Sequence, residues 1–134
     1  MNQQDLEVFE KLAGQIESVY DELSLLSKKS PSDAVNTFKL RFLNSLLAAA
    51  NDLLGTAYRP FADFEQFDED ALPQNSDAVF ILSQYLQCFE KLRADNVIMR
   101  NGAWHWVIEA KGHRDADQAG KIYVRTVRPK KLRE

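Results

Sequence analysis

The chain has 134 residues, of which 45% are apolar and 28% charged, and its formal net charge is −3. These values are typical of one globular domain, here residues 1–134, and exclude a collagen-like, disordered or disulfide-rich chain. The longest uncharged apolar stretch, residues 42–51, is about half of what spans a bilayer, and no signal-like segment opens the chain. The only cysteine, Cys88, cannot form an intramolecular disulfide. We therefore expect a cytoplasmic protein without a membrane segment.

The charges are unevenly distributed along the chain. Residues 1–76 contain 13 acidic and six basic side chains, a balance of −7, whereas residues 77–134 contain seven acidic and 11 basic ones, a balance of +4. We expect these two parts to face different partners, or each other.

Two long helices are predicted in the first part of the chain. Apolar residues recur every three or four positions over residues 4–29, which indicates one amphipathic helix. Gly14 either weakens this helix by about 1 kcal/mol relative to alanine or marks a close helix crossing. For the second helix, antiparallel to the first, we expect Ser30 as N-cap, Pro31 at the first helical position, Asp33 closing a capping box and Gly55 as the C-terminal stop.

The apolar surface of this second helix is wider than one stripe. The first stripe consists of Val35, Phe38, Phe42, Leu46, Ala49 and Leu53, and the second of Leu43, Leu47, Ala50 and Leu54. Such a surface must be covered on more than one side. We expect the helix to be central in the fold, or to form part of an oligomer interface.

Residues 56–75 show no clear periodicity. Phe61, Phe64 and Phe67 are spaced by three, which predicts a short helical or 3₁₀ turn pinned to the core. The acidic side chains between them are then expected in solvent, as a docking surface for a basic partner or for the basic tail of a second copy: Asp63, Glu65, Asp68, Glu69 and Asp70. Calcium is disfavoured, because the segment lacks the glycine and the ligand spacing of an EF-hand.

A third helix and a small sheet complete the predicted fold. Ser76 and Asp77 open a helical pattern that ends at Asn96, after which the apolar period changes from 3.6 to 2. Asn101-Gly102 joins strands 97–100 and 103–111 in a hairpin, and strand 121–127 returns antiparallel. The predicted class is α+β: a three-helix core over about residues 4–95, a three-stranded antiparallel meander over 97–128 and a basic tail, 129–134.

The hairpin register decides where the tryptophans lie. It pairs Met99 with Trp104 and Val97 with Trp106, which places both indoles on one apolar face. We expect this face to cover the helices. The alternative, an exposed aromatic platform that stacks on ligand rings, needs cations beside it, and Arg100 falls on the opposite face. His105 is expected on the outer face as a surface histidine.

Motifs for catalysis or cofactor binding are sparse. His113, Asp115 and Asp117 are candidate metal ligands, but they share one polar loop without a supporting shell, so we expect no metal. Cys88 is expected to be a buried structural thiol. The sequence contains no phosphate-binding glycine loop, nucleophile elbow or zinc motif. We therefore expect a non-enzymatic protein without a cofactor.

The end of the chain is basic. The cations that we single out are Arg125, Arg128, Lys130, Lys131 and Arg133. Three helices followed by a small antiparallel sheet is also the element order of winged-helix DNA-binding domains, although the first two helices are long for that fold and the third carries few cations. We predict an intracellular interaction or regulatory module for an unidentified protein partner, with self-association through the second helix. The alternative is nucleic-acid binding by the third helix, the hairpin and the basic tail.

Overall fold

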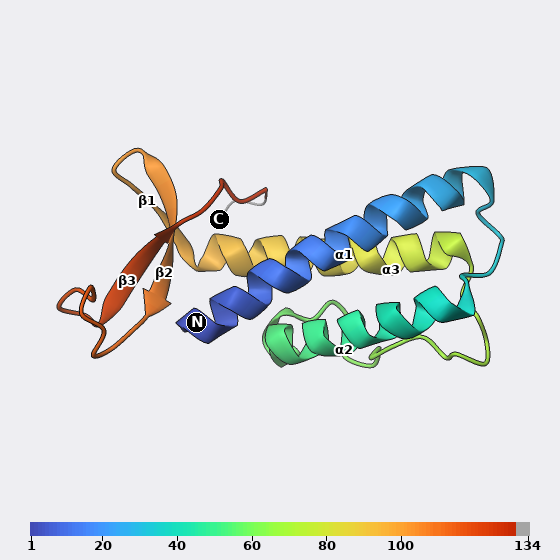
Figure 1. The fold of residues 1–134 in the computed structure, drawn as a ribbon, viewed down its shortest axis with the longest axis horizontal. Coiled ribbons are helices and arrows are strands. Elements are labelled where there is room, and N and C mark those ends of the chain that lie inside the picture. The colour runs from blue at the N-terminus through green and yellow to red at the C-terminus, as the bar shows by residue number, and fades with distance from the viewer. Residues whose placement is uncertain (131–134) are drawn as a thin grey trace.

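The computed structural model describes residues 1–130 of the chain. Its elements are α1 (Gln3–Lys29), α2 (Thr37–Tyr58), α3 (Asn75–Asp95), β1 (Val97–Arg100), β2 (Ala103–Glu109) and β3 (Lys121–Arg125). Three long helices lie together and the antiparallel sheet, in the order β1-β2-β3, lies at one end of them (Figure 1). The predicted α+β class and element order are confirmed. No helix among these residues is long and apolar enough to cross a membrane.

The first helix is continuous through Gly14, as predicted. Its N-cap, Asn2, accepts a hydrogen bond from the Asp5 N–H at 2.8 Å, and the Asp5 carboxylate accepts one from the Asn2 N–H at 3.1 Å. A methyl group built on Gly14 meets nothing within 4 Å, so this glycine marks no close helix crossing.

The predicted start of α2 is wrong. Residues 30–36 form a turn instead of a helical start, and Asn36 caps the helix by accepting a hydrogen bond from the Lys39 N–H at 3.2 Å. The physical reason is a competing partner: the Val35 N–H donates to the Pro73 carbonyl at 2.9 Å, which ties this turn to the segment before α3. Gly55 breaks the helix as a kink, with φ 63° and ψ −173°, and one more turn follows before Arg59.

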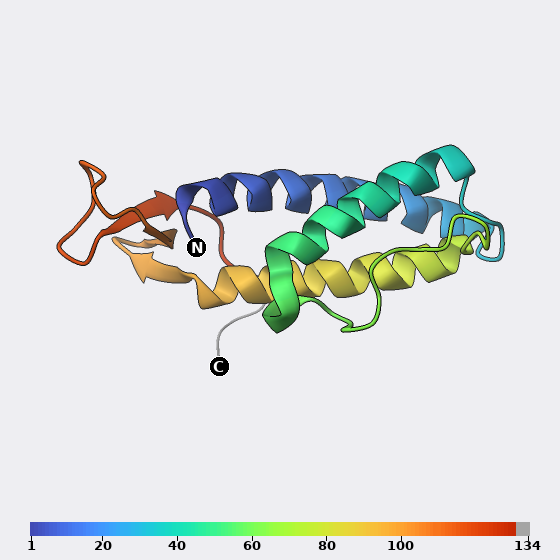
Figure 2. The same cartoon turned by 90° about the horizontal axis from the view of Figure 1, so that it is seen from below.

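Of the two alternatives predicted for α2, the central position in the fold is wrong. The most extensive packing is between α1 and α3, and α2 crosses this pair on one side (Figure 2). The stripe containing Leu43 and Leu47 faces the core, whereas Phe38 and Phe42 of the other stripe are 68% and 58% exposed.

The third helix begins one residue earlier than predicted, at Asn75, with Gln74 as N-cap. Asp77 takes part in the cap, because its carboxylate accepts a hydrogen bond from the Gln74 N–H at 3.1 Å. Asn96 ends the helix as predicted.

Apart from a turn at residues 62–63, the aromatic segment between α2 and α3 is irregular, so the prediction that Phe61, Phe64 and Phe67 share one helical or 3₁₀ turn is wrong. Asn44 holds the backbone of Phe67 by two hydrogen bonds, both 2.9 Å long, and Asn51 donates to the Glu65 carbonyl at 3.1 Å. These two buried amides replace the bonds that a helical turn would make. Phe64 and Phe67 pack against the core, as expected, with ring centroids 5.3 Å apart.

The sheet has the predicted hairpin register. Val97 pairs with Trp106 and Met99 with Trp104, and Asn101 and Gly102 have the positive φ values, 52° and 77°, that a two-residue turn needs. Trp106 is 0% exposed, and its ring packs edge-on against Phe9 of α1 at 4.9 Å. Trp104 is only partly buried, although it packs against the core.

Candidate functional site

The five predicted acidic residues lie on the outside of the segment between α2 and α3. The side chains of Asp63, Glu65, Asp68, Glu69 and Asp70 are all exposed. Asp68 accepts a hydrogen bond from the Asp70 N–H at 2.9 Å, which forms a local turn. Within residues 1–130, no group of three His, Cys, Asp or Glu side chains is arranged to hold a metal ion.

The loop between β2 and β3 is organised by Asp117. Its carboxylate accepts hydrogen bonds from the Tyr123 hydroxyl at 2.6 Å and from the N–H groups of Ala119 and Lys121 at 2.9 and 3.0 Å. The bond from Tyr123, followed by that from Lys121, lowers the pKa of Asp117, and the same bond raises the pKa of Tyr123. His113 instead accepts from the Asp115 N–H at 3.1 Å. Asp117 therefore shapes the loop and does not converge with the other two candidate ligands.

The cations of the predicted basic end have different surroundings. Arg125 and Arg128 are exposed, whereas Lys131 and Arg133 lie outside the described residues. Lys130 is engaged: its N–H donates to Glu90 at 3.2 Å, and its ammonium lies 4.0 Å from the Glu17 carboxylate. Pro129 before it is buried, so the segment after β3 returns to the helices (Figure 1).

Cys88 and His105, the two other residues considered for a functional role, both make structural contacts. Cys88 lies half-buried on α3 and packs against the core. His105 is partly buried on β2, where its Nδ1 lies 3.0 Å from the Ala103 carbonyl.

The sequence interpretation missed a buried arginine where the helices meet the sheet. Arg93 is 7% exposed, and its guanidinium lies 5.2 Å from the ring centroids of both Phe9 and Trp106. It donates to the Thr126 hydroxyl at 2.6 Å and lies 3.8 Å from Glu10 and 3.4 Å from Glu90. The sequence signal for its burial is the position of Arg93 four residues after Phe89, on the buried stripe of α3.

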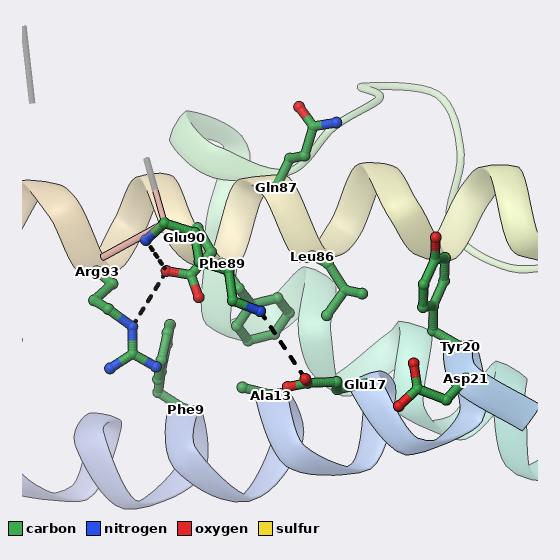
Figure 3. Close-up of a pocket in the computed structure, with 11 residues that line it drawn as sticks. Phe9, Ala13, Glu17, Tyr20, Asp21, Leu86, Gln87, Phe89, Glu90 and Arg93 are labelled. Atoms are coloured by element: carbon green, nitrogen blue, oxygen red, sulfur yellow. Dashed lines mark hydrogen bonds and ion pairs between the residues drawn. The ribbon is translucent and has the colours of Figure 1, made fainter. Parts of the chain in front are cut away.

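A half-open cleft of about 490 Å³ lies between α1 and α3, next to this arginine (Figure 3). Its lining consists of Phe9, Ala13, Glu17, Tyr20, Asp21, Leu86, Gln87, Phe89, Glu90, Arg93 and Lys130. Arg93 and Tyr20 lie at opposite ends of the row of side chains in Figure 3, with Glu17 and Glu90 between them. The cleft thus has an apolar floor and a charged rim, and its size is that of a ligand site.

A second, smaller hollow of about 190 Å³ lies between α1 and α2. Its lining, which we call the α1/α2 face, consists of Val19, Glu22, Leu23, Val35, Phe38, Lys39, Phe42 and Leu43. The rings of Phe38 and Phe42 contact each other edge-on at 5.0 Å, and Lys39 forms an ion pair of 2.7 Å with Glu22 across the hollow.

The fold and these surfaces define an α+β protein in which a three-stranded sheet packs on one end of three helices and two concave surfaces flank α1. In comparisons with known proteins, no family model, no curated protein and no solved structure matches the chain.

Proposed function

We propose that this chain is a protein-interaction module that self-associates through the α1/α2 face. The observation that carries the proposal is the exposure of two neighbouring phenylalanines, Phe38 and Phe42, beside an apolar hollow. Burial of a phenylalanine side chain is worth about 1.5–3 kcal/mol, and exposed apolar clusters mark interaction sites.

The shape of the face favours a second copy of the chain as its partner. The projecting rings and the hollow lie on the same surface, so a two-fold axis lets the rings of each copy enter the hollow of the other. The rim carries one acidic and one basic residue, Glu22 on α1 and Lys39 on α2. Because these two side chains pair with each other within one copy at 2.7 Å, the rim presents no uncompensated charge that would oppose the approach of a second copy.

Sedimentation velocity over a concentration series tests this proposal. The chain is expected to form dimers, and Phe38→Ser with Phe42→Ser is expected to raise the dimer dissociation constant at least about tenfold. Phe80→Ser is the matched control, because Phe80 on α3 is exposed to 58%, like Phe42, but does not line the hollow. If the chain remains monomeric at about 1 mM, or if Phe80→Ser has the same effect, the proposal is wrong.

The two charged regions are proposed as docking surfaces for other proteins. Five exposed carboxylates between α2 and α3 favour a basic partner, and the exposed Arg125 and Arg128 favour an acidic one. The lone cysteine supports our further proposal of a reducing, cytoplasmic location.

Nucleic-acid binding remains the second candidate function, favoured by the exposure of Arg125 and Arg128 near the sheet. Winged-helix-like binding also needs α3 at the surface, whereas α3 packs along α1 and has Lys91 as its exposed cation. Binding to a DNA or RNA duplex at two salt concentrations tests this candidate. A binder must weaken steeply as salt is added, and absence of binding at low salt rejects it.

A further inference from the structure

We propose that the cleft between α1 and α3 is a binding site for a lysine-bearing, extended peptide segment, and that Lys130 of the chain's own C-terminal segment occupies its mouth until such a ligand binds. This site shares no lining residue with the α1/α2 face, so it does not depend on the function proposed above.

The charges of the cleft select a cation. Arg93 already has two carboxylates beside it, Glu10 at 3.8 Å and Glu90 at 3.4 Å. Farther along α1, the rim carries Glu17 and Asp21, and of these only Glu17 has an ion-pair partner within residues 1–130, the Lys130 ammonium at 4.0 Å. An arriving ammonium group therefore finds uncompensated negative charge at this end of the cleft.

The apolar floor of the cleft favours a ligand that carries apolar groups in addition to its charge. Ala13 and Leu86 line the cleft together with Phe9 and Phe89, which are almost fully buried. A lysine side chain fits such a surface, because its methylene stem packs on apolar atoms while its ammonium stays at the polar rim.

The chain itself shows which chemistry the cleft accepts. The residues after β3 return to α3, Pro129 is buried, and Lys130 reaches both rims, with its N–H on Glu90 and its ammonium near Glu17. The Lys130 side chain is bound only weakly, since it is 73% exposed. An exposed ion pair of this kind is weak, so a competing segment with better contacts can displace it.

A backbone contact favours a peptide over a simple amine. The Lys130 N–H donates to the Glu90 carboxylate at 3.2 Å, next to the ammonium that reaches Glu17. A lysine within a peptide repeats both contacts, one from its backbone and one from its side chain. An alkylamine supplies only the ammonium.

The test uses the full chain and a fluorescein-labelled peptide, TVRPK, which copies residues 126–130. Fluorescence anisotropy should show binding to the wild type and binding about two- to fivefold tighter to Lys130→Ala, because the ammonium that competes for Glu17 is removed. In the Lys130→Ala background, Glu17→Gln with Asp21→Asn should weaken binding about tenfold. Ala13→Leu, which fills the floor with a good helix former, should weaken binding similarly while the helix content is unchanged.

The matched control neutralises two carboxylates in the acidic segment, Asp63→Asn with Glu65→Gln, and should leave peptide binding unchanged. If this control weakens binding as much as the cleft variants do, the peptide binds by general charge attraction and the proposal is overturned. It is also overturned if no binding is seen at about 1 mM chain, or if acetyl-lysine amide competes as well as the peptide.

Discussion

At the scale of single residues, two buried asparagines decide the path of the chain between α2 and α3. Asn51 donates to the Glu65 carbonyl at 3.1 Å and accepts from the Tyr85 hydroxyl at 2.7 Å. It thereby links three segments of the chain through one amide. Burial raises the pKa of Tyr85, so its hydroxyl stays protonated and donates to this amide over the whole neutral range.

Replacing Asn51 by leucine, which has a similar volume, tests this role. The substitution leaves the Tyr85 hydroxyl and the Glu65 carbonyl without their partner, and each lost partner in a buried site costs about 1–3 kcal/mol. We expect the free energy of unfolding, measured with urea, to fall by about 2–4 kcal/mol. Asp52→Ala, at the exposed neighbouring position, should change it by less than about 0.5 kcal/mol. Equal effects of the two substitutions would refute the structural role of Asn51.

The Asp117–Tyr123 hydrogen bond gives the sheet loop a defined dependence on pH. Because the pKa of Asp117 is lower in the folded chain than the ordinary value of about 3.9, this carboxylate stabilises the fold above about pH 4. That contribution disappears as the pH falls through the lowered pKa. Tyr123→Phe should move the pKa of Asp117 back toward its ordinary value, as followed by carboxyl-carbon NMR titration. Tyr20→Phe, far from this loop in the fold, should leave the titration of Asp117 where it is, and a similar shift in both variants would contradict the assignment.

At the scale of elements, the two glycines in helical segments have opposite roles. Gly14 lies in a regular part of α1 with open space around it, whereas Gly55 has φ 63° and ψ −173°, a conformation that is essentially restricted to glycine. Gly14→Ala should therefore stabilise the chain by about 0.5–1 kcal/mol. Gly55→Ala should destabilise it by about 1–3 kcal/mol. Thermal unfolding of both variants measures the difference, and a destabilising Gly14→Ala would show that this surface of α1 is occupied in the native protein.

The sequence predicts those elements whose backbone bonds are local. Helical periodicity locates α1 and α3 to within about two residues, and Asn101-Gly102 determines the hairpin register. Prediction fails where the backbone partner is distant in sequence: Val35 bonds to Pro73, and Asn44 bonds to Phe67. No local pattern contains such bonds, so the sequence predicts a helix start for the turn before α2 and a short helical or 3₁₀ turn for the aromatic segment.

The same distinction applies to the candidate sites. Exposure of the acidic segment follows from its composition, and the surplus apolar surface of α2 follows from its two stripes, with Phe38 and Phe42 as the exposed part. The cleft could not be predicted, because its walls come from α1, α3 and Lys130, and it exists only once these segments pack. Arg93 gave a weak signal, a cation on an apolar stripe, which sequence alone cannot distinguish from an exposed helix position.

At the scale of the whole molecule, the sheet and the helices share one core. Phe9 of α1 contacts Phe89 of α3 at 5.2 Å and Trp106 of β2 at 4.9 Å between ring centroids. The first residue of the chain adds a backbone link, since the Glu109 N–H donates to the Met1 carbonyl at 2.9 Å. The helices and the sheet are therefore expected to unfold together.

Both tryptophans lie in β2, so tryptophan fluorescence reports on the sheet while far-ultraviolet circular dichroism reports mainly on the helices. In urea, the two signals should give the same midpoint, because loss of the sheet exposes Phe9 and loss of α1 exposes Trp106. Phe9→Ala should lower the free energy of unfolding by about 3–5 kcal/mol and shift both midpoints together. Val8→Ala, at the neighbouring exposed position on α1, should shift neither. A fluorescence midpoint well below that of circular dichroism would mean that the sheet folds as a separate, weaker unit, and that residues 1–134 are not one cooperative domain.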